Sequence, residues 1–153
     1  YITTPILFKL IDSNLPFEKI VMMVQKEVGD RFCSSPSKKE YGALTVILNY
    51  FFEIKKEFIV GRNNFYPIPN VDSVVVSFKR KEKIDMLLNK NHFINLVHDS
   101  FQFRRKTLRN NLKRYDISIV EKVLNKYGYD LNVRAEVLDY KIFIDISNNL
   151  VSE

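Results

Sequence analysis

The stretch FYPIPNVDSVVVSFK, residues 65–79, decides the fold, because in it a stiff loop leads directly into a strand. Pro67 and Pro69 fix their own φ angles and keep the loop extended. The run from Val71 to Lys79 (VDSVVVSFK) is rich in valine and alternates between apolar and polar side chains over its last four residues, which is typical of a β-strand. The sequence therefore predicts a stiff loop followed by a strand over residues 71–79.

The residues before this loop predict alternating helices and strands. Thr4 is expected to cap a helix with Pro5 at its first position, and this helix is expected to end near residues 13–14. The apolar run Lys19–Gln25 (KIVMMVQ) predicts a strand buried on both faces, as in a parallel sheet. Helices are also predicted over 26–33 and 41–52, a short strand over 58–60, a loop at 34–37 and a turn at 61–64. This order predicts the second half of an α/β sheet that finishes in an antiparallel pair.

After residue 82 the sequence becomes helical in character. Helices are predicted over 92–101, 104–114, 118–127 and 139–148, and Gly128 is a suitable stop for the third of them. We therefore expect two domains, the later part of an α/β domain over 1–82 and a small all-helical domain over 83–153.

The composition is that of a globular protein. The 153 residues are 46% hydrophobic and 27% charged, which excludes disorder and collagen-like or low-complexity chains. The single cysteine, Cys33, cannot form an internal disulfide. The longest apolar run, residues 46–52, is too short to cross a bilayer, and we expect no secretory signal at the N-terminus. The expectation is a soluble, cytoplasmic monomer.

The run Gln102–Tyr115 (QFRRKTLRNNLKRY) carries the densest charge. The chain has a net charge of +6, and this run holds six bases and no acid, whereas residues 116–153 hold seven acids and four bases. The positive charge is therefore concentrated, which favours contact with a polyanion over the alternative of a solvated helix face. The six bases are Arg104, Arg105, Lys106, Arg109, Lys113 and Arg114.

On a helix over 104–114 these bases would have a defined geometry. Arg105, Arg109 and Lys113 follow one another at four-residue intervals and would form one stripe able to neutralise several phosphates. Asn110 and Asn111 would add hydrogen bonds to sugars or base edges. The sequence thus predicts a nucleic-acid contact on this helix.

The loop that opens at Phe65 is a second candidate site. A stiff loop that presents Phe65 and Tyr66 at a sheet edge could stack on an unpaired base. The alternative is that both rings only pin the loop to the core. Asp72 is expected to form a turn at the strand entrance rather than to take part in chemistry.

Other polar groups give weaker signals. The segment 25–27 (QKE) follows a predicted strand, where α/β sheets collect ligands, but a helical ion pair between Glu27 and Arg31 is the more ordinary interpretation. His92 and His98 are six residues apart, which is poor spacing for shared metal ligation, so we expect no metal site.

Five stretches in order resemble one family. They are YITTPILFKLI, VMMVQKEVGDRF, KKEYGALTVILNYFF, FYPIPNVDSVVV and SFQFRRKTLRNNLKRY. Together they resemble the bacterial small-subunit (16S) rRNA adenine N6,N6-dimethyltransferases, the kasugamycin-resistance methyltransferase family. The P-x-P-x-V-D-S loop combined with the F-x-x-R-R-K-T-L-R-N-N-L block is the most specific part. The resemblance runs nearly end to end.

The resemblance implies a fold and an activity. The family has a Rossmann-like domain that uses S-adenosylmethionine, followed by a small helical domain, and it dimethylates N6 of two adjacent adenosines in a hairpin near the 3′ end of small-subunit rRNA. By this resemblance Phe65 would stack on the target base. The residues implied in rRNA contact are Arg104, Arg105, Lys106, Arg109 and Lys113. The implied partner is small-subunit rRNA in an assembling particle.

One departure from the family matters. Its glycine-rich cofactor loop, its acidic cofactor ligands and its N-L-P-Y motif match no position here, because the resemblance begins directly after N-L-P-Y, at Tyr1. No cofactor-binding or metal residue is carried over, and we expect a C-terminal portion that is inactive alone. The open alternative is a non-catalytic RNA-binding or ribosome-assembly module, either intact or trimmed at its initiator.

Overall fold

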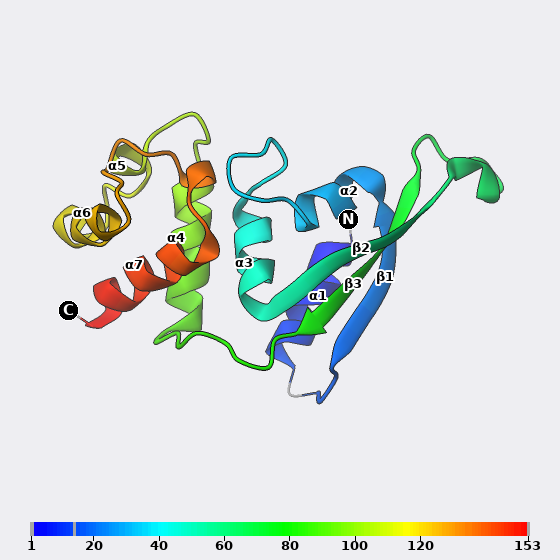
Figure 1. The fold of residues 1–153 in the computed structure, drawn as a ribbon, viewed down its shortest axis with the longest axis horizontal. Helices are drawn as coiled ribbons and strands as arrows, with labels where there is room; N and C mark the ends of the chain where they lie inside the picture. Colours follow the sequence, from blue (N-terminus) through cyan, green and yellow to red (C-terminus); the bar gives the residue numbers. More distant parts are fainter. Residues whose placement is uncertain (1, 14, 153) are drawn as a thin grey trace. The chain divides into compact units, whose positions relative to one another are not determined.

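The computed structural model describes residues 2–13 and 15–152, and its contacts divide the chain into two compact units (Figure 1). The first unit contains the residues up to Cys33 together with Phe51–Glu82, and the second contains Ser34–Tyr50 and the residues from Lys83 onward. Residues 34–50 thus group with the helical part of the chain. The domain limits 1–82 and 83–153 remain a prediction.

A three-stranded sheet organises the first unit, in the order β1-β3-β2. Strand β3 is antiparallel to both neighbours, so β1 and β2 run in the same direction. The stretch that follows the two prolines therefore supplies the central strand, and the predicted antiparallel pair of the last two strands is confirmed. The elements are helix α1 (Thr3–Asp12), β1 (Lys19–Gln25), helix α2 (Lys26–Phe32), β2 (Phe52–Val60), a short 3-10 helix η1 (Arg62–Asn64) and β3 (Ser73–Arg80).

Helix α2 packs directly on the central strand. At Gly29 the helix backbone comes so close to β3 that a Cβ atom would overlap the Cγ1 methyl of Val74. Farther along β3, the Phe78 ring meets the edge of Phe32 at 5.5 Å and of Phe52 at 5.8 Å between centroids. All three rings are buried, so one face of the sheet carries the core of this unit.

Two sequence predictions in this unit are wrong. Strand β1 has the predicted limits, but it is antiparallel to its neighbour, and Val21 and Met23 are exposed. An apolar run does not by itself distinguish a doubly buried strand from one with a single covered face. Helix α1 begins at Thr3 with Ile2 as its N-cap, so Thr4 is not the cap. The predicted end of this helix at residue 14 lies outside the described residues, whereas Asp12 ends it in the structure.

Strand β2 is longer than the sequence predicts. It begins at Phe52, immediately after helix α3 (Ala43–Phe51), and extends to Val60, whereas only residues 58–60 were expected to be extended. Charged residues at 53, 55, 56 and 57 mask the strand pattern, because they lie on exposed or partly exposed positions of a strand that pairs with β3 alone among the described residues.

The second unit is helical around one core. Rings from two helices, Phe101 and Phe143, pack at 5.9 Å between centroids, and Phe93 lies beside Tyr50 at 5.4 Å. Gly128 has a φ of +82°, which confirms it as the stop that follows α6. The helices after α3 are α4 (Lys90–Phe101), α5 (Leu108–Asn111), α6 (Ile117–Lys126), the 3-10 helix η2 (Ala135–Val137) and α7 (Tyr140–Ser152).

The helix predicted over 104–114 is wrong, because only residues 108–111 are helical. The N–H groups of Leu108 and Arg109 donate to the carbonyls of Val133 and Leu131 at 2.9 and 3.0 Å, so tertiary contacts replace the bonds of a preceding helical turn. The expected stripe of Arg105, Arg109 and Lys113 therefore does not form on one helix face.

The close approach at Gly29 gives a test of the fold. Replacing Gly29 with Ala should lower the free energy of unfolding by about 1–3 kcal/mol, because the added methyl group must displace Val74 in a packed core. Urea denaturation measures the effect. Gly61→Ala is the control, since a Cβ there meets only Asn64 Nδ2 at 3.6 Å. Equal stability of the two variants would contradict the packing.

Candidate nucleic-acid interface

The basic run 102–115 is a compact turn around α5, and its six cations fall into two groups. Three arginines face carboxylates. Their ion pairs are Arg104–Glu136 at 3.1 Å, Arg109–Glu121 at 3.8 Å and Arg114–Asp99 at 3.4 Å.

The other three cations carry the free positive charge of the turn. Arg105, Lys106 and Lys113 are exposed, and none has an ion-pair partner among residues 2–13 and 15–152. Unpaired cations on a surface retain their attraction for phosphate groups, whereas a paired arginine must first give up its carboxylate. The sequence pattern found the charged run but could not separate these two groups.

Arg104 holds this turn to the segment before α3. Its guanidinium donates to the carbonyl oxygens of Tyr41 at 2.6 Å, Lys39 at 3.0 Å and Lys38 at 3.3 Å. The Tyr41 hydroxyl in turn donates to the Leu138 carbonyl at 2.6 Å, and burial raises the pKa of this tyrosine above its ordinary value. Arg104 therefore positions the basic turn.

Asn111 fixes the turn from inside. Its Nδ2 donates to the carbonyl oxygens of Ser100 at 2.9 Å and Phe103 at 3.1 Å, which ties α5 to the end of α4. Asn111 is buried, so the predicted exposure of this side chain to sugars or bases is wrong, whereas Asn110 is exposed. Residues 103–107 are thus held in shape without being helical.

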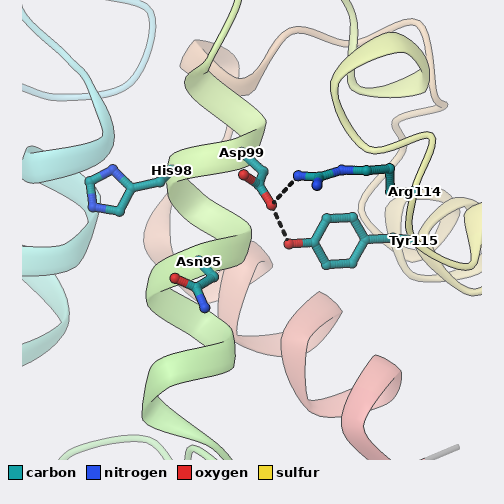
Figure 2. A pocket seen from close by; sticks show the side chains of 5 residues that line it. All are labelled: Asn95, His98, Asp99, Arg114 and Tyr115. Atoms are coloured by element: carbon teal, nitrogen blue, oxygen red, sulfur yellow. Dashed lines mark hydrogen bonds and ion pairs between the residues drawn. The ribbon is translucent and has the colours of Figure 1, made fainter.

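A polar hollow of about 480 Å³ lies beside α4, lined by Asn95, His98, Asp99, Arg114 and Tyr115. Figure 2 shows Arg114 and Tyr115 both directed at Asp99, with His98 pointing away from them. The Tyr115 hydroxyl donates to Asp99 Oδ2 at 2.6 Å, and burial together with this bond raises the pKa of Tyr115. Asp99 is thus committed to orienting Arg114 and Tyr115.

The loop that opens at Phe65 lies in the first unit. Tyr66 is 99% exposed, so it does not pin the loop to the core, while Phe65 is half-buried. Asp72 Oδ1 accepts a hydrogen bond from the Arg62 N–H at 2.9 Å, which joins the two ends of the loop. The loop is closed at its base and displays an aromatic side chain.

In the segment 25–27, Lys26 pairs with Asp30 of α2 at 3.0 Å, and Asp30 also pairs with Lys56 of β2 at 2.8 Å. The hydrogen bond from Lys56 is the largest cause of a lowered pKa at Asp30. Within the described ranges no group of three or more His, Cys, Asp or Glu residues could hold a metal ion, and no helix is long and apolar enough to cross a membrane.

Comparison with known proteins decides the family. The model of the ribosomal RNA adenine dimethylase family matches residues 1–151. The chain belongs to this family. A ribosomal RNA small subunit methyltransferase A from Bacillus cytotoxicus is 41% identical over 99% of this chain, and one from Bacillus cereus is 40% identical over the same share. The resemblance seen in the five sequence stretches is confirmed.

Solved structures confirm the fold class of this chain. A dimethyladenosine transferase from Plasmodium falciparum superposes with a TM-score of 0.80 at 27% identity, covering 95% of this chain and 61% of that one. The 23S rRNA methyltransferase ErmE superposes with a TM-score of 0.69 at 22% identity, covering 98% and 61%. Both likenesses support the Rossmann-like sheet with an appended helical part.

The chain spans about half the length of the curated relatives it matches, 54% of each. The family implies S-adenosylmethionine, but the residues present do not fit that cofactor. Gly29 is packed against Val74, Gly128 ends a helix, and Gly42 and Gly61 stand alone, so the glycines form no cradle that could approach a nucleotide. We therefore assign no residue of this chain to the methyl-donor pocket.

Sequence reasoning missed two groups of residues. The carboxylates that neutralise the arginines come from other segments, and spacing within the basic run could not reveal them. Phe103 was also passed over, although it is the one aromatic residue among residues 102–114 and stands directly before the basic residues, and that contrast was a usable signal.

The role of Arg104 gives a stability test. Replacing Arg104 with Lys should lower the free energy of unfolding by about 2 kcal/mol, because an ammonium cannot reach three carbonyls and Glu136 together. Arg105→Lys is the matched control and should stay within about 0.5 kcal/mol of the parent. Thermal or urea denaturation followed by circular dichroism measures both. Identical loss in the two variants would refute a special role for Arg104.

Proposed function

We propose that this chain is the rRNA-binding, base-positioning part of an S-adenosylmethionine-dependent rRNA adenine N6,N6-dimethyltransferase. The substrate would be two adjacent adenosines in the 3′-terminal hairpin of small-subunit rRNA, methylated during assembly of the subunit. Membership of the family over residues 1–151 carries this proposal. The resemblance to relatives that act on the small subunit favours that substrate over large-subunit rRNA.

The charge distribution supports RNA contact by the second unit. Arg105, Lys106 and Lys113 project from a turn that Arg104 and Asn111 hold in place. Phosphate contacts of this kind position a protein on RNA without reading its sequence. In this proposal Arg104 and Arg109 contribute positive potential while they remain paired with carboxylates.

The first unit would supply the contact with the target base. An enzyme that modifies an adenine amine must take the base out of its stack and hold it against an aromatic or apolar surface. Phe65 is the residue proposed for this stacking, and it lies in the loop that the Arg62–Asp72 hydrogen bond closes. Tyr66 is the adjacent and more exposed ring, which makes it the natural comparison.

The unpaired cations should govern RNA affinity. Neutralising Arg105, Lys106 and Lys113 to Gln together should weaken binding to a small-subunit rRNA hairpin and lower the slope of log affinity against log salt by about 3, since each phosphate contact contributes about 1. Filter binding over a salt series measures it. Lys141→Gln removes one charge from α7 of the same unit and should leave affinity nearly unchanged. An unaltered slope in the triple variant would exclude this turn as the contact surface.

Phe65 should affect methyl transfer more than binding. In the complete product of the gene that encodes this chain, Phe65→Ala should lower the rate of N6,N6-dimethyladenosine formation by roughly 5- to 100-fold, the worth of one stacked base, with a smaller effect on RNA affinity. The substrate is small-subunit rRNA that lacks these methyl groups, and mass spectrometry measures the N6,N6-dimethyladenosine that forms in it.

Tyr66→Ala is the control in the same loop, and it should retain most of the activity. A larger loss of methylation rate in Tyr66→Ala than in Phe65→Ala would assign the stacking to Tyr66. RNA binding with no methyl transfer by the complete gene product would favour the non-catalytic assembly module instead.

A further inference from the structure

A small hollow of about 280 Å³ opens on the second unit between the 103–107 turn and the residues that follow α5. Its volume is just below the range of about 300–1,000 Å³ that is usual for small-molecule sites, which suits one part of a ligand rather than a whole drug-sized molecule. The lining contains an aromatic ring, amides and cations, and no carboxylate. The six lining residues are Gln102, Phe103, Asn110, Asn111, Lys113 and Arg114.

Phe103 gives this hollow its apolar surface. The side chain is 56% exposed, although it lies in a polar stretch on a basic surface. Its exposure is not that of a loose loop, because the Phe103 carbonyl accepts hydrogen bonds from Lys106 N at 2.8 Å and from Asn111 Nδ2 at 3.1 Å. An exposed ring on a fixed backbone offers a surface on which an unpaired base stacks without regard to its identity.

Asn111 lines the hollow and fixes its shape. The residue is 9% exposed, and both hydrogens of its Nδ2 are used by the carbonyls of Ser100 and Phe103. Its Oδ1 is buried and accepts no hydrogen bond from any described residue.

Charge around the hollow selects an anionic ligand. Lys113 has no ion-pair partner among the described residues, and the side chain of Arg114 is 74% exposed beside Asp99. Gln102 and Asn110 add amide donors and acceptors that suit the edge of any base. In one hollow, an aromatic face suits the flat base of a nucleotide, amide groups suit the polar edges of the base and the sugar, and positive charge suits the phosphate.

We propose that this hollow binds one unpaired nucleotide of the RNA, with its base stacked on Phe103 and its phosphate held by Lys113. The inference rests on the proposed rRNA function and deepens it. The helical unit would then recognise a single-stranded feature of the RNA, in addition to the phosphate contacts made by Arg105 and Lys106.

The test compares two RNA probes with equal numbers of phosphates, a hairpin with an unpaired adenine-rich loop and a fully paired duplex. Phe103→Ala in the complete gene product should weaken hairpin binding by roughly 5- to 100-fold and duplex binding by less than about twofold. Phe103→Trp should restore hairpin binding, because a ring is restored. Phe58→Ala removes a ring that is 59% exposed on β2 and should change neither affinity.

Each other outcome has a distinct meaning. Equal loss on both probes, or failure of Phe103→Trp to restore binding, would refute the hollow as a nucleotide site, since stacking requires an unpaired base and an aromatic face. Unchanged hairpin binding by Phe103→Ala, together with weaker binding by the Arg105, Lys106 and Lys113 triple variant, would overturn this inference and leave the proposed function standing. No RNA binding by the parent protein would overturn both. Unchanged circular dichroism spectra of the variants show that these effects are not caused by unfolding.

Discussion

The hydrogen bonds of the Arg104 guanidinium are the constraint on which the second unit depends. One planar cation satisfies carbonyls at residues 38, 39 and 41 and contacts Glu136, so it joins three segments that are far apart in sequence. Guanidinium geometry suits this task, because its donors form a rigid fork in one plane. Without this junction the segment before α3 would lose its attachment to the basic turn.

This junction also determines which charges remain available to a polyanion. A run of six bases looks uniform in sequence, yet the fold pairs Arg104, Arg109 and Arg114 with carboxylates from three other segments. The remaining cations project from a turn whose backbone bonds to residues 131 and 133. The unpaired positive surface therefore consists of three cations on a fixed turn, and not of a continuous stripe along a helix.

Local patterns predicted the elements well where the chain itself dictates them. The valine-rich run identified β3, the apolar run gave the limits of β1, and Gly128 marked the end of α6. Patterns failed where tertiary contacts decide. The helix expected over 104–114 is interrupted by backbone bonds to a distant segment, and the charged residues of β2 hid a strand that β3 stabilises by pairing. The same holds for the candidate nucleic-acid interface. Residue spacing located the basic run, but it could not reveal the carboxylates that pair with it or the unpartnered Oδ1 of Asn111.

The rim of the sheet affects how this polypeptide behaves at high concentration. Among the residues that the structure describes, β1 is hydrogen-bonded on one side only, and the exposed Val21 and Met23 lie on it. Such a rim recruits extended chains, and in a concentrated preparation the most abundant extended chain is β1 of another molecule.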